Sequence, residues 1–386
     1  MKARKTRALA GVLAIAAVLI GGSSAALLGI CGPFTDVAAD VFCPFVLEIF
    51  YLGITTGTTA TTYDPSSNVS RLQMAAFLSR TVDGVLKRGS RRAILDQFWT
   101  TQNASVLGLT TLGPEPSMVR SDGTDLWVSD DIQHVVYRVR GSDGKLLETW
   151  TGANDAFGVL VATGKVFAAS NSGLHSLYRI DPSQPAGGVT TVATNLGSFP
   201  TGITFDGARI WTANQSGSVS IITPGATLPF TVTTVTSGFV LPLGALYDGS
   251  NVWITDRTPT SLRMLDANGA ILQSVTVGGS PQFPVFDGTN IWVPNAGSQT
   301  VSVVRASTGA LLATLTGNGL STPGVAAFDG ERVLVTDETN DRVSLFKAAD
   351  LSAIGFVPTG TPPFGACSDG THFWITLISS GHLARF

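Results

Sequence analysis

The chain has 386 residues, with 24 Lys and Arg against 27 Asp and Glu, and a formal net charge of −3. Only 13% of the residues are charged while glycine numbers 43, a mixture that favours strands and turns over long exposed helices. The acidic balance argues against a nucleic acid as partner, because no basic face is available to neutralise phosphates.

The N-terminus is typical of an exported protein. The basic segment MKARKTR is followed by the uncharged run ALAGVLAIAAVLI and by GGSSAA. This order predicts a signal peptide over residues 1–25, cleaved near Ala25. The alternative is an uncleaved membrane anchor, because no charge occurs from Ala8 to Cys31. In both cases the remaining chain lies outside the membrane, since the positive end stays inside.

Residues 26–83 are expected to form a small helical domain. Phe45 to Leu52 predicts one helix, and Ser70 followed three residues later by Gln73 predicts a capping box at the start of a second. Cys31 and Cys43 are able to pair in an oxidising compartment, although three cysteines do not make a disulfide scaffold. Cys367 lies in an apolar strand and is expected in the core.

This segment resembles an S-layer homology domain. The matching pieces are Phe34-x-Asp36-Val37, Gly53-Ile54 with Gly57, the turn Tyr63-Asp64-Pro65, and the run from Val69 to Ala75. The resemblance implies a module that holds exported proteins to cell-envelope polysaccharide through a Thr-Arg-Ala-Glu-like motif. Here that motif reads Ser70-Arg71-Leu72-Gln73, and Phe42 replaces the family's Trp.

The resemblance also implies which residues contact the glycan. They are Asp36, Phe42, Arg71 and Gln73. The Arg71 guanidinium suits an acidic substituent on the polymer. Residues 84–103 are expected to be a connector with a short amphipathic helix. Its basic run is interpreted as a solvated face, and contact with acidic polymer is the alternative.

A seven-fold repeat occupies the rest of the chain. A turn followed by an apolar run recurs, usually as Asp-Gly before a Trp strand, with its glycine at 123, 164, 207, 249, 288, 330 and 370. The steps are 41, 43, 42, 39, 42 and 40 residues. Each unit contains four short alternating segments, and Asp-Gly between two of them is a strong hairpin signal. Four strands per unit of about 40 residues predict one β-propeller blade.

The fold class is therefore mainly all-β: a seven-bladed propeller over residues 104–386, preceded by the small helical domain. The last unit ends one strand short, and the segment from Ala104 to Gly113 resembles the missing strand. The N-terminal strand is thus expected to close the last blade, which leaves no break in the ring.

The units resemble the YVTN/YncE-like and NHL-like propeller families, and more distantly the virginiamycin B lyase-type propellers. The resemblance is carried by LVTDETNDRVSLF (Leu334 to Phe346), WTANQSGSVSII and WVPNAGSQTVSVV. It implies a fold rather than a chemistry, because one fold hosts many functions.

No catalytic motif is present: GxSxG, HExxH, CxxC, Walker and GxGxxG patterns are all missing from the sequence. The four histidines, at 134, 175, 372 and 382, are expected at non-equivalent places in three blades. No cofactor is expected, and the sequence does not decide whether a metal is bound.

One ring of polar residues stands out. The residue three after the Trp position is Asp or Asn in five of seven units: Asp130, Asn214, Asp256, Asn295 and Asp337. Symmetry places them together at the loops after the second strands, where they form a candidate rim for a polar ligand or cation. The alternative, which we favour, is that each side chain caps its own loop.

The sequence thus predicts an exported cell-envelope protein, attached to cell-wall polysaccharide by the S-layer-homology-like domain, with a propeller that binds an unknown protein or polar ligand. The alternative is a secreted propeller enzyme of the virginiamycin B lyase-like or glycan-active type.

Overall fold

The computed structural model describes residues 31, 34–38, 42–51, 55–59, 61–78, 81, 109–172 and 174–386. The chain divides into two compact units, Met1–Ser90 and Arg91–Phe386. The predicted signal peptide (1–25), the connector (84–103) and residues 104–108 lie outside the described residues. Within those residues, no helix is long and apolar enough to cross a membrane.

The first unit contains helix α2 (Cys43–Tyr51) and a second helix over residues 71–78. A disulfide joins Cys31 to Cys43. The Phe34 ring is fully buried and packs against Phe50 and Tyr63, with ring centroids 5.1 and 5.5 Å away. A unit this small buries little apolar surface, so a covalent link between its first segment and α2 adds substantially to its stability.

The predicted capping box starts the second helix. The Ser70 amide donates to Gln73 Oε1 at 2.9 Å, and the Gln73 amide donates to Ser70 Oγ at 3.2 Å. Two of the N–H groups at this helix start are thereby satisfied.

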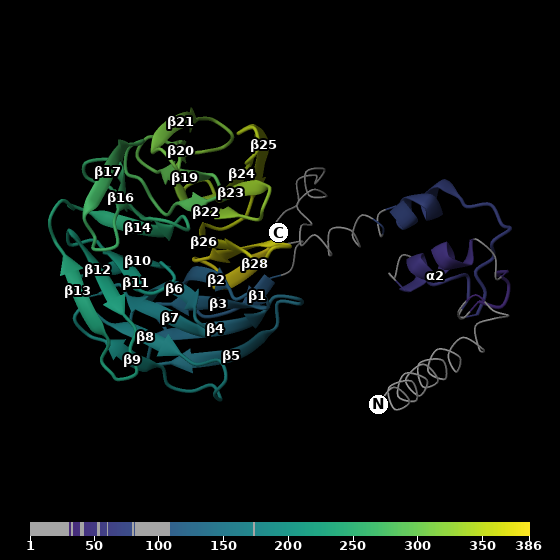
Figure 1. Ribbon diagram of the computed structural model, residues 1–386, viewed down its shortest axis with the longest axis horizontal. Coiled ribbons are helices and arrows are strands. Elements are labelled where there is room, and N and C mark those ends of the chain that lie inside the picture. Colours follow the sequence, from purple (N-terminus) through teal and green to yellow (C-terminus); the bar gives the residue numbers. More distant parts are fainter. Residues whose placement is uncertain are drawn as a thin grey trace, which may run out of the picture. The chain divides into compact units, whose positions relative to one another are not determined.

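The second unit is the predicted seven-bladed propeller, with each blade a four-stranded antiparallel sheet (Figure 1). The first strand of each blade lies nearest the centre and the fourth at the outside. In blades 1 to 3 the strands are β2 (Pro116–Ser121), β3 (Asp125–Asp130), β4 (Val135–Arg140), β5 (Leu146–Thr151), β6 (Ala156–Ala162), β7 (Lys165–Ser170), β8 (Leu177–Ile180), β9 (Thr190–Ala193), β10 (Pro200–Phe205), β11 (Ile210–Asn214), β12 (Ser218–Thr223) and β13 (Thr231–Val235).

Blades 4 to 7 continue the same order. Their strands are β14 (Pro242–Tyr247), β15 (Val252–Asp256), β16 (Ser261–Leu265), β17 (Ile271–Thr276), β18 (Val285–Phe286), β19 (Asn290–Asn295), β20 (Thr300–Arg305), β21 (Ala310–Leu315), β22 (Pro323–Phe328), β23 (Arg332–Asp337), β24 (Arg342–Lys347), β25 (Ala353–Pro358), β26 (Pro363–Ser368), β27 (Phe373–Leu377) and β28 (His382–Arg385).

The strand before blade 1 closes the ring, as predicted. β1 (Leu109–Thr111) pairs antiparallel with β28, so the seventh sheet has the order β1-β28-β27-β26. The first and last described strands of the propeller therefore share one sheet, and no blade is left with three strands.

The Asp-Gly turns are tied to the tryptophans that follow them. In blade 5, Asp287 Oδ1 accepts the amides of Thr289 and Asn290, and Asp287 Oδ2 accepts Trp292 Nε1–H at 2.7 Å. The same Asp–Trp bond occurs in blades 1, 3, 4 and 7. Each tryptophan ring is at most 1% exposed. One carboxylate thus holds the turn and satisfies a buried indole donor.

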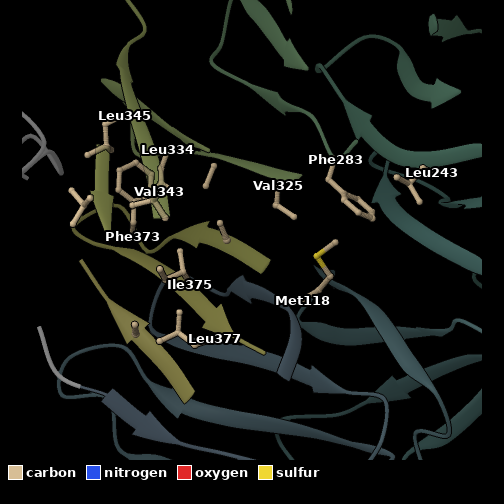
Figure 2. Packing of buried hydrophobic residues seen from close by; sticks show 14 residues of the cluster. Met118, Leu243, Phe283, Val325, Leu334, Val343, Leu345, Phe373, Ile375 and Leu377 are labelled. Carbon is tan, nitrogen blue, oxygen red and sulfur yellow. The ribbon is translucent and has the colours of Figure 1, made fainter. Parts of the chain in front are cut away.

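Apolar side chains fill the centre of the ring at the starts of the inner strands. Figure 2 shows Met118, Leu243, Phe283 and Val325 from different blades within one cluster. Phe157 and Phe364 pack against the same cluster, 6.1 and 6.2 Å from Phe283 between ring centroids. These side chains therefore close one end of the central channel that the seven inner strands surround, and we call them the aromatic closure.

Candidate binding sites

The four predicted glycan residues of the first unit have different surroundings. The Asp36 carboxylate accepts the amides of Tyr63 and Asp64 at 2.8 and 2.7 Å. The Tyr63 amide is the main reason that the pKa of Asp36 lies below its usual value. Asp36 thus links the first segment to the Tyr63-Asp64-Pro65 turn.

The other three residues lie near the helix starts. Phe42 precedes α2 and is 66% exposed. Arg71 is exposed in the first turn of the second helix, and Gln73 belongs to the capping box. The Arg71 side chain forms no hydrogen bond or ion pair with another residue in the described part of this unit. Its guanidinium is therefore available to an acidic ligand, whereas the Asp36 oxygens already accept hydrogen bonds.

The predicted rim of Asp and Asn residues lies inside the blades. Asp130, Asn214, Asp256, Asn295 and Asp337 all have an exposure of 0%. Asp256 accepts the amides of Val240 and Leu241 and pairs with Arg263 at 3.2 Å. Asp130 and Asp337 accept loop amides in the same way. These bonds are those of loop caps.

The two asparagines bond across the strand instead. Asn295 Nδ2 donates to the hydroxyls of Thr300 and Ser302 at 3.1 and 3.0 Å, and Asn214 bonds two serines of β12 likewise. None of the five residues presents its side chain to solvent, so their assignment as ligand contacts stays a prediction.

In each of the seven blades, the residue that directly follows the rim position lies beside the loop that leads into the inner strand. These seven residues, which we call the mouth ring, are Asp131, Asn171, Gln215, Arg257, Ala296, Glu338 and Ile378. In blades 2, 3, 4, 5 and 7 their backbone amide donates to a carbonyl of that entry loop. All seven are partly exposed.

Three members of the mouth ring are charged. Asp131 Oδ1 accepts the Ser117 hydroxyl at 3.3 Å, which places this carboxylate beside the second residue of an inner strand. Glu338 Oε1 lies 3.8 Å from where a Cβ atom on Gly324 would be, the equivalent place in blade 6. Both carboxylates therefore lie above the inner strands, on the side of the aromatic closure.

The electrostatics of the mouth ring are those of partly desolvated charges. Burial raises the pKa of Asp131 and of Glu338 above the usual carboxyl value. Burial lowers the pKa of Arg257, an effect that Glu338 opposes. Arg257 Nε and Asn171 Oδ1 are buried and have no hydrogen-bond partner among the described residues. Titratable groups with perturbed pKa values that gather in one place are typical of binding sites.

Two histidines occupy equivalent positions, and the expectation of four non-equivalent places is wrong for them. His134 and His175 both precede a third strand and both have positive φ, 59° and 52°. Their carbonyls accept the amides of Ala153 and Leu196. The blade 2 loop is one residue longer, which hides the equivalence in the sequence.

His134 also lies beside a carboxylate. Its Nδ1 accepts the Asp155 amide at 3.0 Å and lies 3.5 Å from Asp155 Oδ1. No group of three His, Cys, Asp or Glu residues suited to a metal ion occurs in the part of the chain that the structure describes.

Fold and sites together define a two-part protein, with a small helical domain and a propeller that carries a polar mouth. Comparison with known families agrees, because residues 33–75 match the model of the S-layer homology domain. No curated protein is significantly similar to the chain.

Among solved structures, the propeller is similar to virginiamycin B lyase from Staphylococcus aureus, with 14% identity, coverage of 72% of this chain and 97% of that chain, and a TM-score of 0.62. A catalytically inactive variant of that enzyme with quinupristin matches at 15% identity, 72% and 98% coverage, and a TM-score of 0.62. Hydrazine synthase from Kuenenia stuttgartiensis matches at 16% identity, with coverage of 75% of this chain and 98% of that chain, and a TM-score of 0.62. At such identities the likeness concerns the fold alone.

Proposed function

We propose that this chain is an exported cell-envelope protein, whose S-layer homology domain attaches to cell-wall polysaccharide and whose propeller is a binding platform. The observation that carries the attachment is the family match over residues 33–75. Such a domain implies association with the cell surface or envelope, and polysaccharide is what these domains generally bind.

Arg71 is the residue that we expect to contact the polymer most strongly. It is exposed at the start of a helix, where a capping box fixes the backbone. A planar guanidinium can bind an acidic substituent through two parallel hydrogen bonds. The Nε2 group of Gln73 and the ring of Phe42 are the further contacts that we propose, while Asp36 orients the adjoining turn.

Co-sedimentation of the full chain with purified cell-wall polysaccharide tests the attachment. The chain is expected to pellet with the polymer, and less of it should pellet after the acidic substituents of the polymer have been removed chemically. A chain that stays in the supernatant at all polymer concentrations would contradict the proposal.

The platform that we propose is the mouth ring above the aromatic closure. Asp131, Arg257 and Glu338 supply charge of both signs, while Phe157 and Phe364 supply apolar surface below them. A ligand or protein segment with mixed polar and apolar groups suits this arrangement. Asp130, Asp256 and Asp337 contribute by holding the loops from which the mouth ring projects.

A second candidate is a propeller enzyme of the virginiamycin B lyase-like or glycan-active type. The observation that favours it is His134, held 3.5 Å from the Asp155 carboxylate on a loop. Turnover of quinupristin or of a cell-wall glycan, lost in His134→Asn, would support the enzyme. Binding to the propeller without turnover would support the platform.

A further inference from the structure

The opposite half of the central channel contains a cavity of about 360 Å³. All seven inner strands line it. Each contributes the residue that pairs, in the strand register, with the buried Trp, Phe or Leu of the second strand of its blade. In six blades this residue is uncharged: Leu160, Thr204, Leu246, Val285, Ala327 and Cys367. The volume is in the range of small-molecule sites, which begin at about 300 Å³.

In blade 1 the same position is Arg120, and of the described residues that line this cavity it alone is charged. Its Nη1 donates to the Val119 carbonyl at 2.9 Å and to the Ala366 carbonyl at 3.4 Å. These two bonds hold the guanidinium against the inner strands of blades 1 and 7. They use only part of its donor capacity, because a guanidinium has five N–H groups.

No carboxylate of the described residues pairs with Arg120. Among the described residues it forms no ion pair, and neither its Nε nor its Nη2 donates a hydrogen bond. Neither nitrogen is among the buried polar atoms that lack a partner, so both keep some accessible surface, and Arg120 is a lining residue of the cavity. Burial lowers the pKa of Arg120, because the charged guanidinium is partly removed from water. An unpaired, partly desolvated cation attracts an anion strongly.

The acidic turns next to the cavity do not supply that anion. The nearest ones in sequence, Asp122 and Asp369, each bond two turn amides and a tryptophan Nε1. Their carboxylates are thus committed to the turns. The remaining polar groups of the lining are the hydroxyls of Thr204, Tyr247 and Ser368 and the Cys367 thiol.

We propose that this cavity is a binding site for a small organic carboxylate with an apolar body. Arg120 pairs with the carboxylate through Nε and Nη2, in the fork geometry that guanidinium and carboxylate share. Leu160, Leu246, Val285 and Ala327 surround the hydrocarbon part. The aromatic closure in the other half of the channel separates this site from the mouth ring, so the site opens on one side only.

Titration calorimetry on the full chain tests this, with benzoate as the probe and benzamide as its neutral analogue. We expect saturable binding of benzoate, no comparable binding of benzamide, and a dissociation constant about 10- to 100-fold weaker in Arg120→Met. Arg140→Met, which changes an exposed arginine of β4, is the matched control and should bind as the wild type does.

Two further arms separate the alternatives. Inorganic phosphate that binds as well as benzoate would show a simple anion site and overturn the proposed ligand class. Ala327→Leu keeps Arg120 but fills the cavity, so it should weaken benzoate binding even if Arg120→Met does not fold. Absence of benzoate binding, equal binding of benzamide, or undiminished binding in both cavity variants would also overturn the proposal.

Discussion

Thr376 Oγ1 donates a hydrogen bond to the Ser117 carbonyl at 2.7 Å, across 259 positions of the sequence. It links the second strand of blade 7 to the inner strand of blade 1. Ser129, Thr255 and Thr336 form the equivalent bonds to the next blade, at 2.6, 2.8 and 2.9 Å. Side-chain hydroxyls close to the axis thus complement the shared β1 strand in closing the ring.

Thr376→Val should destabilise the propeller by about 1–3 kcal/mol, because it leaves the Ser117 carbonyl and the Gly365 amide without their partner. The measurement is the midpoint of urea unfolding. Thr276→Val, an exposed threonine on β17, makes the same chemical change away from the axis and serves as the control. Equal midpoints for the two variants would contradict the role assigned to Thr376.

Asp287→Ala should lower the free energy of unfolding by about 2–3 kcal/mol, because it leaves the buried Trp292 Nε1–H and two turn amides without an acceptor. Asp266 also accepts two amides of a turn but bonds no tryptophan. Asp266→Ala is therefore expected to cost clearly less. If both variants lose the same unfolding free energy, the indole bond contributes nothing and the explanation of the repeat is wrong.

The charged residues of the mouth ring should make the stability of the propeller depend on pH. Because burial raises the pKa of folded Asp131, its ionisation destabilises the fold at neutral pH, and this cost is absent below the unfolded pKa near 3.8. Asp131→Asn should raise the melting temperature at pH 7 by on the order of 1–2 °C. At pH 3 the difference from the wild type should vanish.

Asp181 is the control of opposite sign. The Lys165 ammonium, 2.6 Å away, holds the pKa of Asp181 at about 2. Its contribution is present above the unfolded pKa and is lost as the pH falls through about 2. Asp181→Asn should therefore lower the melting temperature at pH 7. A stabilising effect of Asp181→Asn, or a destabilising one of Asp131→Asn, would refute the electrostatic assignment.

Reduction of the Cys31–Cys43 disulfide should loosen the first unit and leave the propeller unchanged. A short loop closed by a disulfide stabilises a fold by about 2–3 kcal/mol. The remaining cysteine, Cys367, is buried in the propeller and has a pKa raised to about 12 by burial, so it does not compete as a thiolate. Hydrogen exchange within residues 31–78 should accelerate on reduction, whereas faster exchange in the propeller strands would contradict this.

Much of the fold follows from the sequence, because each blade repeats one unit whose turn is set by local chemistry. Asp-Gly fixes the hairpin and the missing fourth strand of blade 7 identifies β1 as its partner. The turn depends only on neighbouring residues, and the closing strand follows from counting strands, so the sequence alone predicts both.

The mouth ring could not be read in this way. The second strands are buried on both faces between neighbouring blades, so the sequence of β19 does not alternate between apolar and polar residues. Nothing in it indicates that Asn295 points inward while the following residue reaches the mouth. Arg120 did leave a signal, a lone charge where other inner strands have apolar or small residues, but its unpaired state depends on contacts with blade 7.

The most direct test of the proposed attachment is the affinity of full-length Arg71→Ala for purified cell-wall polysaccharide, compared with Arg140→Ala. Both variants remove one exposed arginine, but only Arg71 lies in the S-layer homology domain. We predict that Arg71→Ala weakens binding by about tenfold or more while Arg140→Ala binds like the wild type. Equal affinities of the two variants would contradict the account.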